Sequence, residues 1–497
     1  MVKAYLTLEK VFKKIDDIQG ARSVLQWDSA VMMPPGSSEV RGDQLATLQK
    51  LEHAILSDPD IGGLLDEAEN HKAKLNPWQK ANLCEMKRSW KHITIVDSKL
   101  IEALVKAGTT CEHAWREARK NNDFETYRPL QQKVLDLVRE VAKVKGAAFG
   151  CSPYEALIDQ YDPGMKEKTL SGIFESLEAF LPEFVQSVLE HQSKNHKVTA
   201  FKEKVSVEKQ KALAEFLLDK LGFDRQHGRF DTSTHPFCGG VPGDVRITSR
   251  YDEENPLSSM YGVIHENGHA LYESGLPCEW RSQPVGKARG MGVHESQSLL
   301  WEMQIGMSHP FMEFAVPHMK QIYGSTSRAL SASNIYRTVT KVEPSLIRVD
   351  ADEVTYPGHI LLRYHLEQYM IKGDLNIDEL PDAWEQGMLK YLNIKVPDNK
   401  DGCMQDIHWT DGTFGYFPSY TIGAILAAQI FQTVEQAIPD LSEQTRQGEF
   451  SSLRKWLQEH LHGLGSRYTT NTLIEKVTGK PLDIECYKNH LRKRYLA

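Results

Sequence analysis

Apolar residues recur along most of this 497-residue chain at spacings of three and four. Because an α-helix turns once every ~3.6 residues, such spacings place these residues on one helix face. We therefore expect amphipathic helices around the apolar positions of 8–18, 45–55, 130–141, 174–184 and 213–221. Breaker residues at Pro34-Pro35-Gly36, Pro163-Gly164 and Gly239-Gly240 separate such stretches.

One stretch departs from the helical period. Val245 and Ile247 alternate with Arg246 and Thr248, which is the period of a strand. We expect two short strands over 229–237 and 244–251, joined as a hairpin by the turn 238–243. Such an edge strand can pair with an extended peptide backbone. A surface hairpin with no role in binding would show the same pattern.

The chain has no internal repeat, low-complexity tract or flexible linker. Together with the dominant helical period, this predicts one mainly α body over 1–497. Hydrophobic residues make up 40% and charged residues 25% of the sequence, as in a water-soluble globular protein.

Charge and cysteine usage narrow the class of function further. The net charge is −8 and no basic tract is present, which argues against a nucleic-acid partner. We find neither a run of eighteen apolar residues nor an apolar secretory segment, so we expect no membrane span. The seven cysteines are far apart and form no CxxC pair, which favours free thiols and a cytoplasmic location.

The run His-Glu-Asn-Gly-His at 265–269 points to a metal site. His265 and His269, four residues apart, project from one helix face and can share a metal at roughly 2.0–2.1 Å per Zn–N bond. Glu266 can then take a proton from the water at that metal. The flanking residues support a helix over 258–273. The alternative is an ordinary helix that carries two unrelated histidines.

A catalytic zinc of this kind needs a third protein ligand and keeps one position open for water. The segment 294–302 reads as a second helix that begins near Glu295, far enough along the chain for an antiparallel return. Glu302 is a rival ligand, because position i+7 shares the same face. Glu295 can also be explained as a carboxylate that complements the helix dipole. We predict His265, His269 and Glu295 as the metal ligands.

Other short motifs accompany this run along the chain. They are Trp27-Asp28, Met33-Pro34, His235-Pro236-Phe237, Asp244-Val245-Arg246-Ile247-Thr248, His294-Glu295-Ser296-Gln297, Ile347-Arg348-Val349-Asp350-Ala351-Asp352, Gly402 to Trp409 and Gly415 to Tyr420. In residues, order and spacing, the whole set resembles the carboxypeptidase Taq family of HExxH metallocarboxypeptidases. The resemblance covers essentially the entire chain.

This resemblance implies a mainly α, large helical two-lobed body with a deep central groove and a small β-sheet next to the metal site. Residues 1–200 would form a mostly helical lobe and groove wall, and 201–497 the metal-site region. It implies release of single C-terminal residues from peptides with broad specificity, and a homodimer. It also implies that His265, His269 and Glu295 bind one Zn²⁺ (or Co²⁺) per chain, with Glu266 as the base.

Hydrolysis also needs donors for the developing oxyanion. His408, Tyr416 and Tyr420 lie among glycines that would let a loop approach the substrate. We predict catalytic contacts for His408 and Tyr420 and a substrate contact for Tyr416. Tyrosines packed in the core with satisfied hydroxyls are the alternative. Asp406 would either orient a metal-bound histidine or have a plain structural role.

An exopeptidase must recognise the free C-terminal carboxylate, for which arginine offers a planar fork of donors. Arg348 is the predicted residue, held in place by Asp352 four positions later, although a purely structural Arg348–Asp352 pair is equally compatible. Arg246 is the rival. His235 and Arg246, on the expected hairpin, are predicted to line the substrate groove, and either can instead be structural.

Two other functions fit parts of the pattern. A related metallopeptidase would cut inside oligopeptides or release dipeptides, and a peptide with a blocked C-terminus separates it from a carboxypeptidase. A non-catalytic zinc scaffold for peptide or protein partners would have no use for Glu266 beside the metal. The motif set therefore favours a metallocarboxypeptidase.

Overall fold

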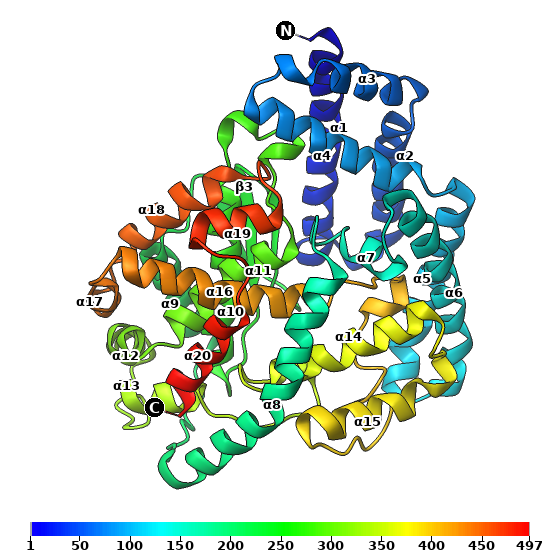
Figure 1. Cartoon of the computed structure of the whole chain (residues 1–497). Coiled ribbons are helices and arrows are strands. Elements are labelled where there is room, and N and C mark those ends of the chain that lie inside the picture. Colours follow the sequence, from blue (N-terminus) through cyan, green and yellow to red (C-terminus); the bar gives the residue numbers. More distant parts are fainter. Residues whose placement is uncertain (1, 497) are drawn as a thin grey trace.

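The computed structural model describes residues 2–496, which fold mainly into helices (Figure 1). The α-helices are α1 (Lys3–Val31), α2 (Ser38–Leu56), α3 (Pro59–Asn70), α4 (Pro77–Thr94), α5 (Ser98–Lys120), α6 (Phe124–Phe149), α7 (Pro153–Ile158), α8 (Glu167–Asn195), α9 (Val207–Leu221), α10 (Pro256–Gly275), α11 (Met291–Leu299), α12 (His309–Tyr323), α13 (Ala332–Val339), α14 (Tyr356–Lys372), α15 (Leu380–Leu392), α16 (Pro418–Ala437), α17 (Leu441–Gln447), α18 (Ser451–His460), α19 (Thr470–Thr478) and α20 (Ile484–Tyr495).

Shorter elements connect these helices. The strands are β1 (Gly228–Thr232), β2 (Cys238–Val241) and β3 (Asp244–Ser249). The 3-10 helices are η1 (Pro35–Ser37), η2 (Lys72–Lys74), η3 (Cys278–Trp280), η4 (Pro284–Gly286), η6 (Arg348–Asp350), η7 (Ile377–Glu379), η8 (His408–Asp411) and η9 (His462–Leu464), and η5 (Leu300–Gly306) is a π-helix.

The periodic segments of the sequence are helices. α1, α2, α6, α8 and α9 cover the five stretches predicted from apolar spacing, and the mainly α fold with a small sheet is confirmed. Local sequence sets their ends. α6, for example, begins after Asp123, whose carboxylate accepts from the Thr126 N–H, and ends at Gly150 in the left-handed region with φ 68°.

The predicted hairpin is wrong in its topology. Among the described residues the strands form one sheet in the order β1-β3-β2, with β1 parallel and β2 antiparallel to β3. The residues expected to be the turn, 238–241, form β2, and the tight turn is Pro242-Gly243. Glycines at 239 and 240 suggested a turn. Gly240, at φ 85°, is instead needed because the strands approach closely here: a Cβ at this position would lie 2.0 Å from the carbonyl oxygen of Asp244.

One large hydrophobic core joins distant parts of the chain. It extends from Ala107 on α5 to Tyr495 on α20 and includes side chains of α10, α11 and α16. The apolar faces of α1, α3 and α4 form a second cluster at one end of the molecule, and a third lies between the sheet, α9 and α10 (Figure 1). No helix within residues 2–496 has the length and apolar character needed to cross a bilayer.

Candidate metal centre

Two neighbouring helices bring the predicted ligands together. α10 carries His265, Glu266 and His269, and α11 carries Glu295. The sequence indicated a helix that begins near Glu295. α11 instead begins at Met291, so Glu295 lies beyond its first turn. The helices approach closely at Gly268, where a Cβ would lie only 2.6 Å from the carbonyl oxygen of Gln297. This contact sets the metal site between them.

His265, His269 and Glu295 each turn one ligand atom toward a common point. These three atoms lie within 4.8 Å of one another, and the Nε2 of His269 is 3.6 Å from the Oε2 of Glu295. Two imidazole nitrogens and one carboxylate oxygen, with room for a fourth ligand, are the donor set of catalytic zinc sites. The residues present therefore fit the divalent metal that the sequence predicts.

Glu302 orients His265 and lies outside the ligand cluster. Its Oε2 is 2.7 Å from the Nδ1 of His265, which leaves the Nε2 of that imidazole for the metal. Glu302 lies on the π-helix η5, which continues directly from α11. π-helical turns inside longer helices are frequent at functional sites, and carboxylates commonly orient ligand histidines in this way.

A longer relay orients the second histidine. The Nδ1 of His294 is 2.6 Å from the Nδ1 of His269, and its Nε2 is 2.8 Å from the Oε1 of Glu273. His269 thus has its Nδ1 engaged and its Nε2 directed at Glu295. Each ligand histidine is backed by a carboxylate, one directly and one through a second imidazole.

Burial and like charges dominate the electrostatics of the cluster. Burial raises the pKa of the Glu266 carboxyl to about 7, and it also raises the pKa of Glu295. Burial alone would lower the pKa of His265, but the hydrogen bond with Glu302 and the surrounding carboxylate charges raise it to about 10. Burial, with the neighbouring histidines, depresses the pKa of His269. So many buried carboxylates in one place favour a bound cation.

Arg348 lies in a second buried ionic cluster. Its Nε donates to Asp406 at 3.0 Å and its Nη1 donates to the Tyr356 hydroxyl at 2.9 Å. The other oxygen of Asp406 accepts from the Nε of Arg363 at 2.6 Å, and Arg363 is fully buried. Burial alone would raise the pKa of Asp406, but the two guanidinium charges hold it well below its usual range. Two cations and one anion leave this cluster with a net positive charge.

The structure contradicts the expected Arg348–Asp352 contact and favours the structural alternative for Asp406. Asp352 does not hold Arg348, because its carboxylate accepts from the backbone N–H groups of Glu343, Val354 and Thr355. Asp406 does not orient a ligand histidine, because both its oxygens bind arginines. The i+4 spacing suggested an Arg348–Asp352 contact, but Arg348 belongs to η6, a single 3-10 turn in which that spacing has no helical meaning.

The segment from His408 to Tyr420 packs against the Arg348 cluster. The His408 ring lies on Phe417 and Tyr416, and the guanidinium of Arg348 is 5.2 Å from the centre of the Tyr420 ring. Burial lowers the pKa of His408 to about 4 and raises the pKa values of the Tyr416 and Tyr420 phenols. All three side chains are therefore neutral at pH 7 and retain protons to donate.

The remaining predicted residues lie around the sheet. Arg246 forms a two-bond pair with Asp244 and stacks on Trp27, with its guanidinium carbon 4.6 Å from the ring centre. His235 is exposed in the loop before β2. Thr248 holds that loop, since its hydroxyl accepts from the Phe237 N–H. Arg246 is thus fully engaged by its neighbours, whereas His235 is free to contact a ligand.

With this geometry established, sequence comparison decides the family. Residues 7–495 match the family model described as Carboxypeptidase Taq (M32) metallopeptidase. The chain belongs to the M32 metallopeptidase family. Thermostable carboxypeptidase 1 of Thermus thermophilus is 36% identical to it over 99% of this chain and 98% of the relative. Thermostable carboxypeptidase 1 of Pyrococcus furiosus is 32% identical over 98% and 97%.

Solved structures agree with this family assignment. Trypanosoma cruzi metallocarboxypeptidase 1 superimposes with a TM-score of 0.98 at 39% identity, with 100% of both chains covered. The M32 carboxypeptidase of Deinococcus radiodurans R1 gives 0.94 at 32% identity and covers 99% of this chain and 98% of its own. The chain is accordingly an M32 metallocarboxypeptidase.

Sequence reasoning missed the residues that support the M32 site from behind. In the sequence His294 stands out only as part of a motif, Glu273 only as a helical residue, and Glu302 only as a rival ligand. The position of His294 next to Glu295 was a usable signal, since the two lie on one short helix. Sequence spacing did not indicate that Tyr356 would bond to Arg348 or that Arg363 would bond to Asp406.

Replacing Glu302 by Ala should weaken metal affinity by roughly 10–100-fold, because His265 loses the acceptor that fixes its orientation. Glu302→Gln keeps an acceptor oxygen and should lose less. Competition with a chromophoric chelator measures the affinity. Glu178→Ala, which removes the carboxylate 3.2 Å from His365 outside the metal cluster, is the control and should bind metal as wild type does. Wild-type affinity in Glu302→Ala would contradict this role.

Proposed function

We propose that this M32 metallocarboxypeptidase releases single C-terminal residues from peptides, with broad tolerance of their side chains. In this proposal His265, His269 and Glu295 bind one zinc or cobalt ion, and Glu266 is the general base. The observation that carries it is the presence of two buried ionic clusters, one that favours a bound cation and one that favours a bound anion. One cluster is rich in carboxylates and imidazoles, and the other has an uncompensated positive charge.

Glu266 is suited to proton transfer at neutral pH. A bound divalent cation would lower the pKa of a coordinated water and polarise the scissile carbonyl. Burial brings the pKa of Glu266 to about 7, where a carboxylate can accept a proton from the attacking water and return it to the leaving amine.

The Arg348 cluster is the proposed site for the C-terminal carboxylate. Arg348, Arg363 and Asp406 are all nearly or fully buried, and a net charge in such a place is costly unless an anion joins it. The substrate carboxylate would supply that anion. Arg348 is the proposed contact, since its charge also acts on Glu295, whereas Arg246 is paired with Asp244. A carboxylate held there would place the last peptide bond near the metal.

Donors for the oxyanion and the peptide backbone come from the loop and the sheet. Neutral His408 and the protonated phenols of Tyr416 and Tyr420 face the Arg348 side of the site and would donate to substrate oxygens. On the other side, β2 is an edge strand whose Cys238 lies near the charges of Glu266 and Glu273. We propose that an extended substrate adds to this edge and passes exposed His235.

Some features of the proposal rest on the family resemblance and composition alone. These are the homodimer, the cytoplasmic location, and the absence of nucleic-acid and membrane partners. The division of the chain into a groove-wall lobe over 1–200 and a metal region over 201–497 also stays a prediction. The large core that joins α5 to α20 supports a single catalytic unit.

The decisive experiment uses one peptide in free-acid and C-terminally amidated forms. We expect stepwise loss of single residues from the acid and no cleavage of the amide, because only the acid can neutralise the Arg348 cluster. A chelator should abolish the reaction, and added zinc or cobalt should restore it. Mass spectrometry reads the products. Equal cleavage of the amide would replace this proposal with an endopeptidase, and full activity in metal-free protein would remove the metal from it.

Replacing Glu266 by Gln should leave about one metal per chain but lower kcat by at least about a hundredfold, the scale of a lost general base. The amide keeps the shape of the side chain and cannot accept the proton. Elemental analysis and steady-state kinetics on the free-acid peptide provide the two readouts. A Glu266→Gln enzyme within a few-fold of wild type would show that another group acts as base.

Replacing Arg348 by Ala should lower kcat/KM on free acids by a factor equivalent to about 2–4 kcal/mol, because a buried charged contact is lost. It should also bring the ratio of kcat/KM for free-acid and amidated peptides toward one. Arg246→Ala is the matched control. It removes a guanidinium that binds Asp244 and Trp27, so it should reduce stability and leave the ratio unchanged. A collapse of the ratio in Arg246→Ala alone would identify the rival arginine as the carboxylate contact.

A further inference from the structure

A buried carboxylate outside both ionic clusters joins α11, which carries Glu295, to α16, which carries Tyr420. Asp162 is fully buried in the turn after α7. Its Oδ1 accepts from the N–H of Gly292 on α11 at 2.8 Å, and its Oδ2 accepts from the hydroxyl of Ser419 on α16 at 2.5 Å. The contact with α11 uses one of the backbone N–H groups that lack a helical partner in the first turn, whereas the contact with α16 is to a side chain in its first turn.

The two helices hold groups with different tasks in the reaction. Gly292 is three residues before the metal ligand Glu295, and Ser419 directly precedes Tyr420. α11 and α16 pack with almost no clearance: a Cβ on Gly292 would lie 2.8 Å from Ile422, and one on Gly423 would lie 2.7 Å from the side chain of Glu295. Their relative position therefore sets how Tyr420 stands with respect to Glu295.

The same turn makes other contacts with the site. The carbonyl oxygen of Tyr161 accepts from the N–H of Met291, the first residue of α11, at 2.8 Å. The ring of Tyr161 stands edge-on to Tyr416 with 5.1 Å between their centres. The turn that contains Asp162 thus contacts α11, α16 and the ring of Tyr416.

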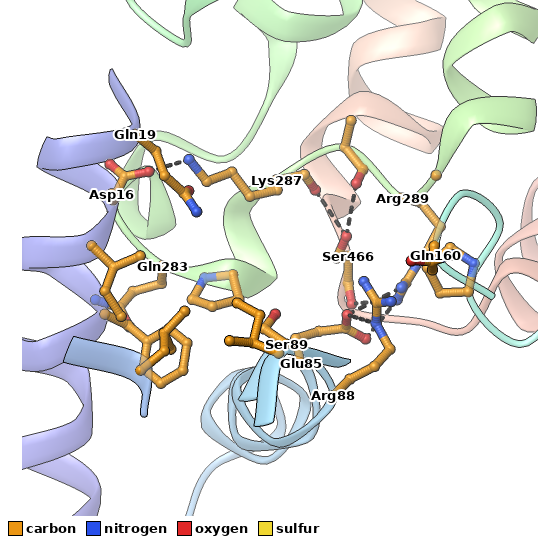
Figure 2. A pocket seen from close by; sticks show the side chains of 18 of the residues that line it. Asp16, Gln19, Glu85, Arg88, Ser89, Gln160, Gln283, Lys287, Arg289 and Ser466 are labelled. Atoms are coloured by element: carbon orange, nitrogen blue, oxygen red, sulfur yellow. Dashed lines mark hydrogen bonds and ion pairs between the residues drawn. The ribbon is translucent and has the colours of Figure 1, made fainter. Parts of the chain in front are cut away.

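Behind this turn lies a cavity instead of packed side chains. The cavity, part of whose lining is drawn in Figure 2, has a volume of about 310 Å³, and its lining includes Tyr161, Pro163, Gly290 and Met291. α1 and α4, with Asp16, Gln19, Glu85 and Arg88, form other parts of its wall. The cavity thus adjoins the neighbours of Asp162, whereas Asp162 itself is fully buried.

We propose that Asp162 is a positioning residue that sets the register between α11 and α16, and thereby the geometry of Glu295 relative to Tyr420. The inference rests on the proposed function for the catalytic part of Tyr420, and on the metal-ligand assignment for Glu295. Asp162 touches neither substrate nor metal, and it acts only through the two helix starts.

Two variants perturb the two contacts of Asp162 separately. Ser419→Ala removes the bond to α16, and we expect kcat to fall by about tenfold with metal affinity within about twofold of wild type, because Tyr420 shifts while the ligands stay. Gly292→Ala adds a Cβ to α11 that would crowd Asp162 and Ile422 of α16, and we expect metal affinity itself to fall by about tenfold because Glu295 is displaced. Steady-state kinetics and competition with a chromophoric chelator on metal-free protein measure the two effects.

Each variant has a matched control in the chain. Thr421→Val removes a buried hydroxyl without a hydrogen-bond partner among the described residues, on the same helix as Ser419. Gly172→Ala adds a Cβ on α8 with nothing within 4 Å. Both should leave kcat and metal affinity within about twofold of wild type. If Ser419→Ala and Gly292→Ala behave like these controls, the positioning role is overturned.

Substitution of Asp162 itself tests both contacts at once. Asp162→Ala should lower metal affinity and kcat each by roughly 10–100-fold. Asp162→Asn, whose oxygen can accept from Gly292 and whose amide can donate to the Ser419 oxygen, should restore most of both. If Asp162→Ala does not fold, the Ser419 and Gly292 variants still decide the question. A folded Asp162→Ala with wild-type kinetics and metal binding would overturn the proposal.

Tyr420→Phe separates this inference from the proposed function. A drop in kcat of at least about tenfold supports Tyr420 as a donor. If Tyr420→Phe is impaired and Ser419→Ala is not, the positioning role fails while the proposed function stands. If Tyr420→Phe keeps wild-type kcat, the donor role and the α16 half of the inference both fall. The metal affinity of Gly292→Ala then tests only whether the contact with α11 positions Glu295.

Discussion

The close approach of α10 to α11 is the constraint on which the site depends. Gly268 lets the helices meet where any side chain would collide with the backbone of Gln297 and Ser298. Only at this separation do His265 and His269 on one helix face Glu295 on the other. The supporting partners follow from the same contact, because Glu302 continues the second helix back to His265, and His294 reaches His269 from its first turns.

Buried charge of opposite preference characterises the two ionic clusters. The metal side concentrates carboxylates whose pKa values are raised by burial, so a cation is favoured there. The Arg348 side concentrates guanidinium groups around a single Asp406, so an anion is favoured there. Neither cluster is neutral by itself. The proposed substrate, a peptide with a free carboxylate at its end and a carbonyl one residue earlier, would satisfy both demands.

Further buried hydrogen bonds and a cation–π contact hold the segments around these clusters in place. Glu367, fully buried on α14, accepts from the indole of Trp409, the hydroxyl of Tyr154 and the N–H of Gly415. It therefore fixes the loop that carries His408 and Tyr416 at two points. On the opposite side, the rings and guanidinium groups of Trp27 and Arg246 fasten α1 to the sheet beside the metal helix. Such supports are needed because catalysis depends on distances being kept to within fractions of an ångström.

The sequence by itself determined the helical class, the metal-ligand candidates and the family motifs, because these depend on local spacing. Apolar periods of three and four require only neighbouring residues, and His265 and His269 share a face by helix geometry alone. Tertiary structure decided the order β1-β3-β2, the clustering of Glu295 with the two histidines while Glu302 bonds to the far side of His265, and the pairing of Arg348 with Asp406 instead of Asp352. These contacts join residues far apart in the chain or on irregular turns, and their partners are chosen by packing and by the need to neutralise buried charge, which no local spacing encodes.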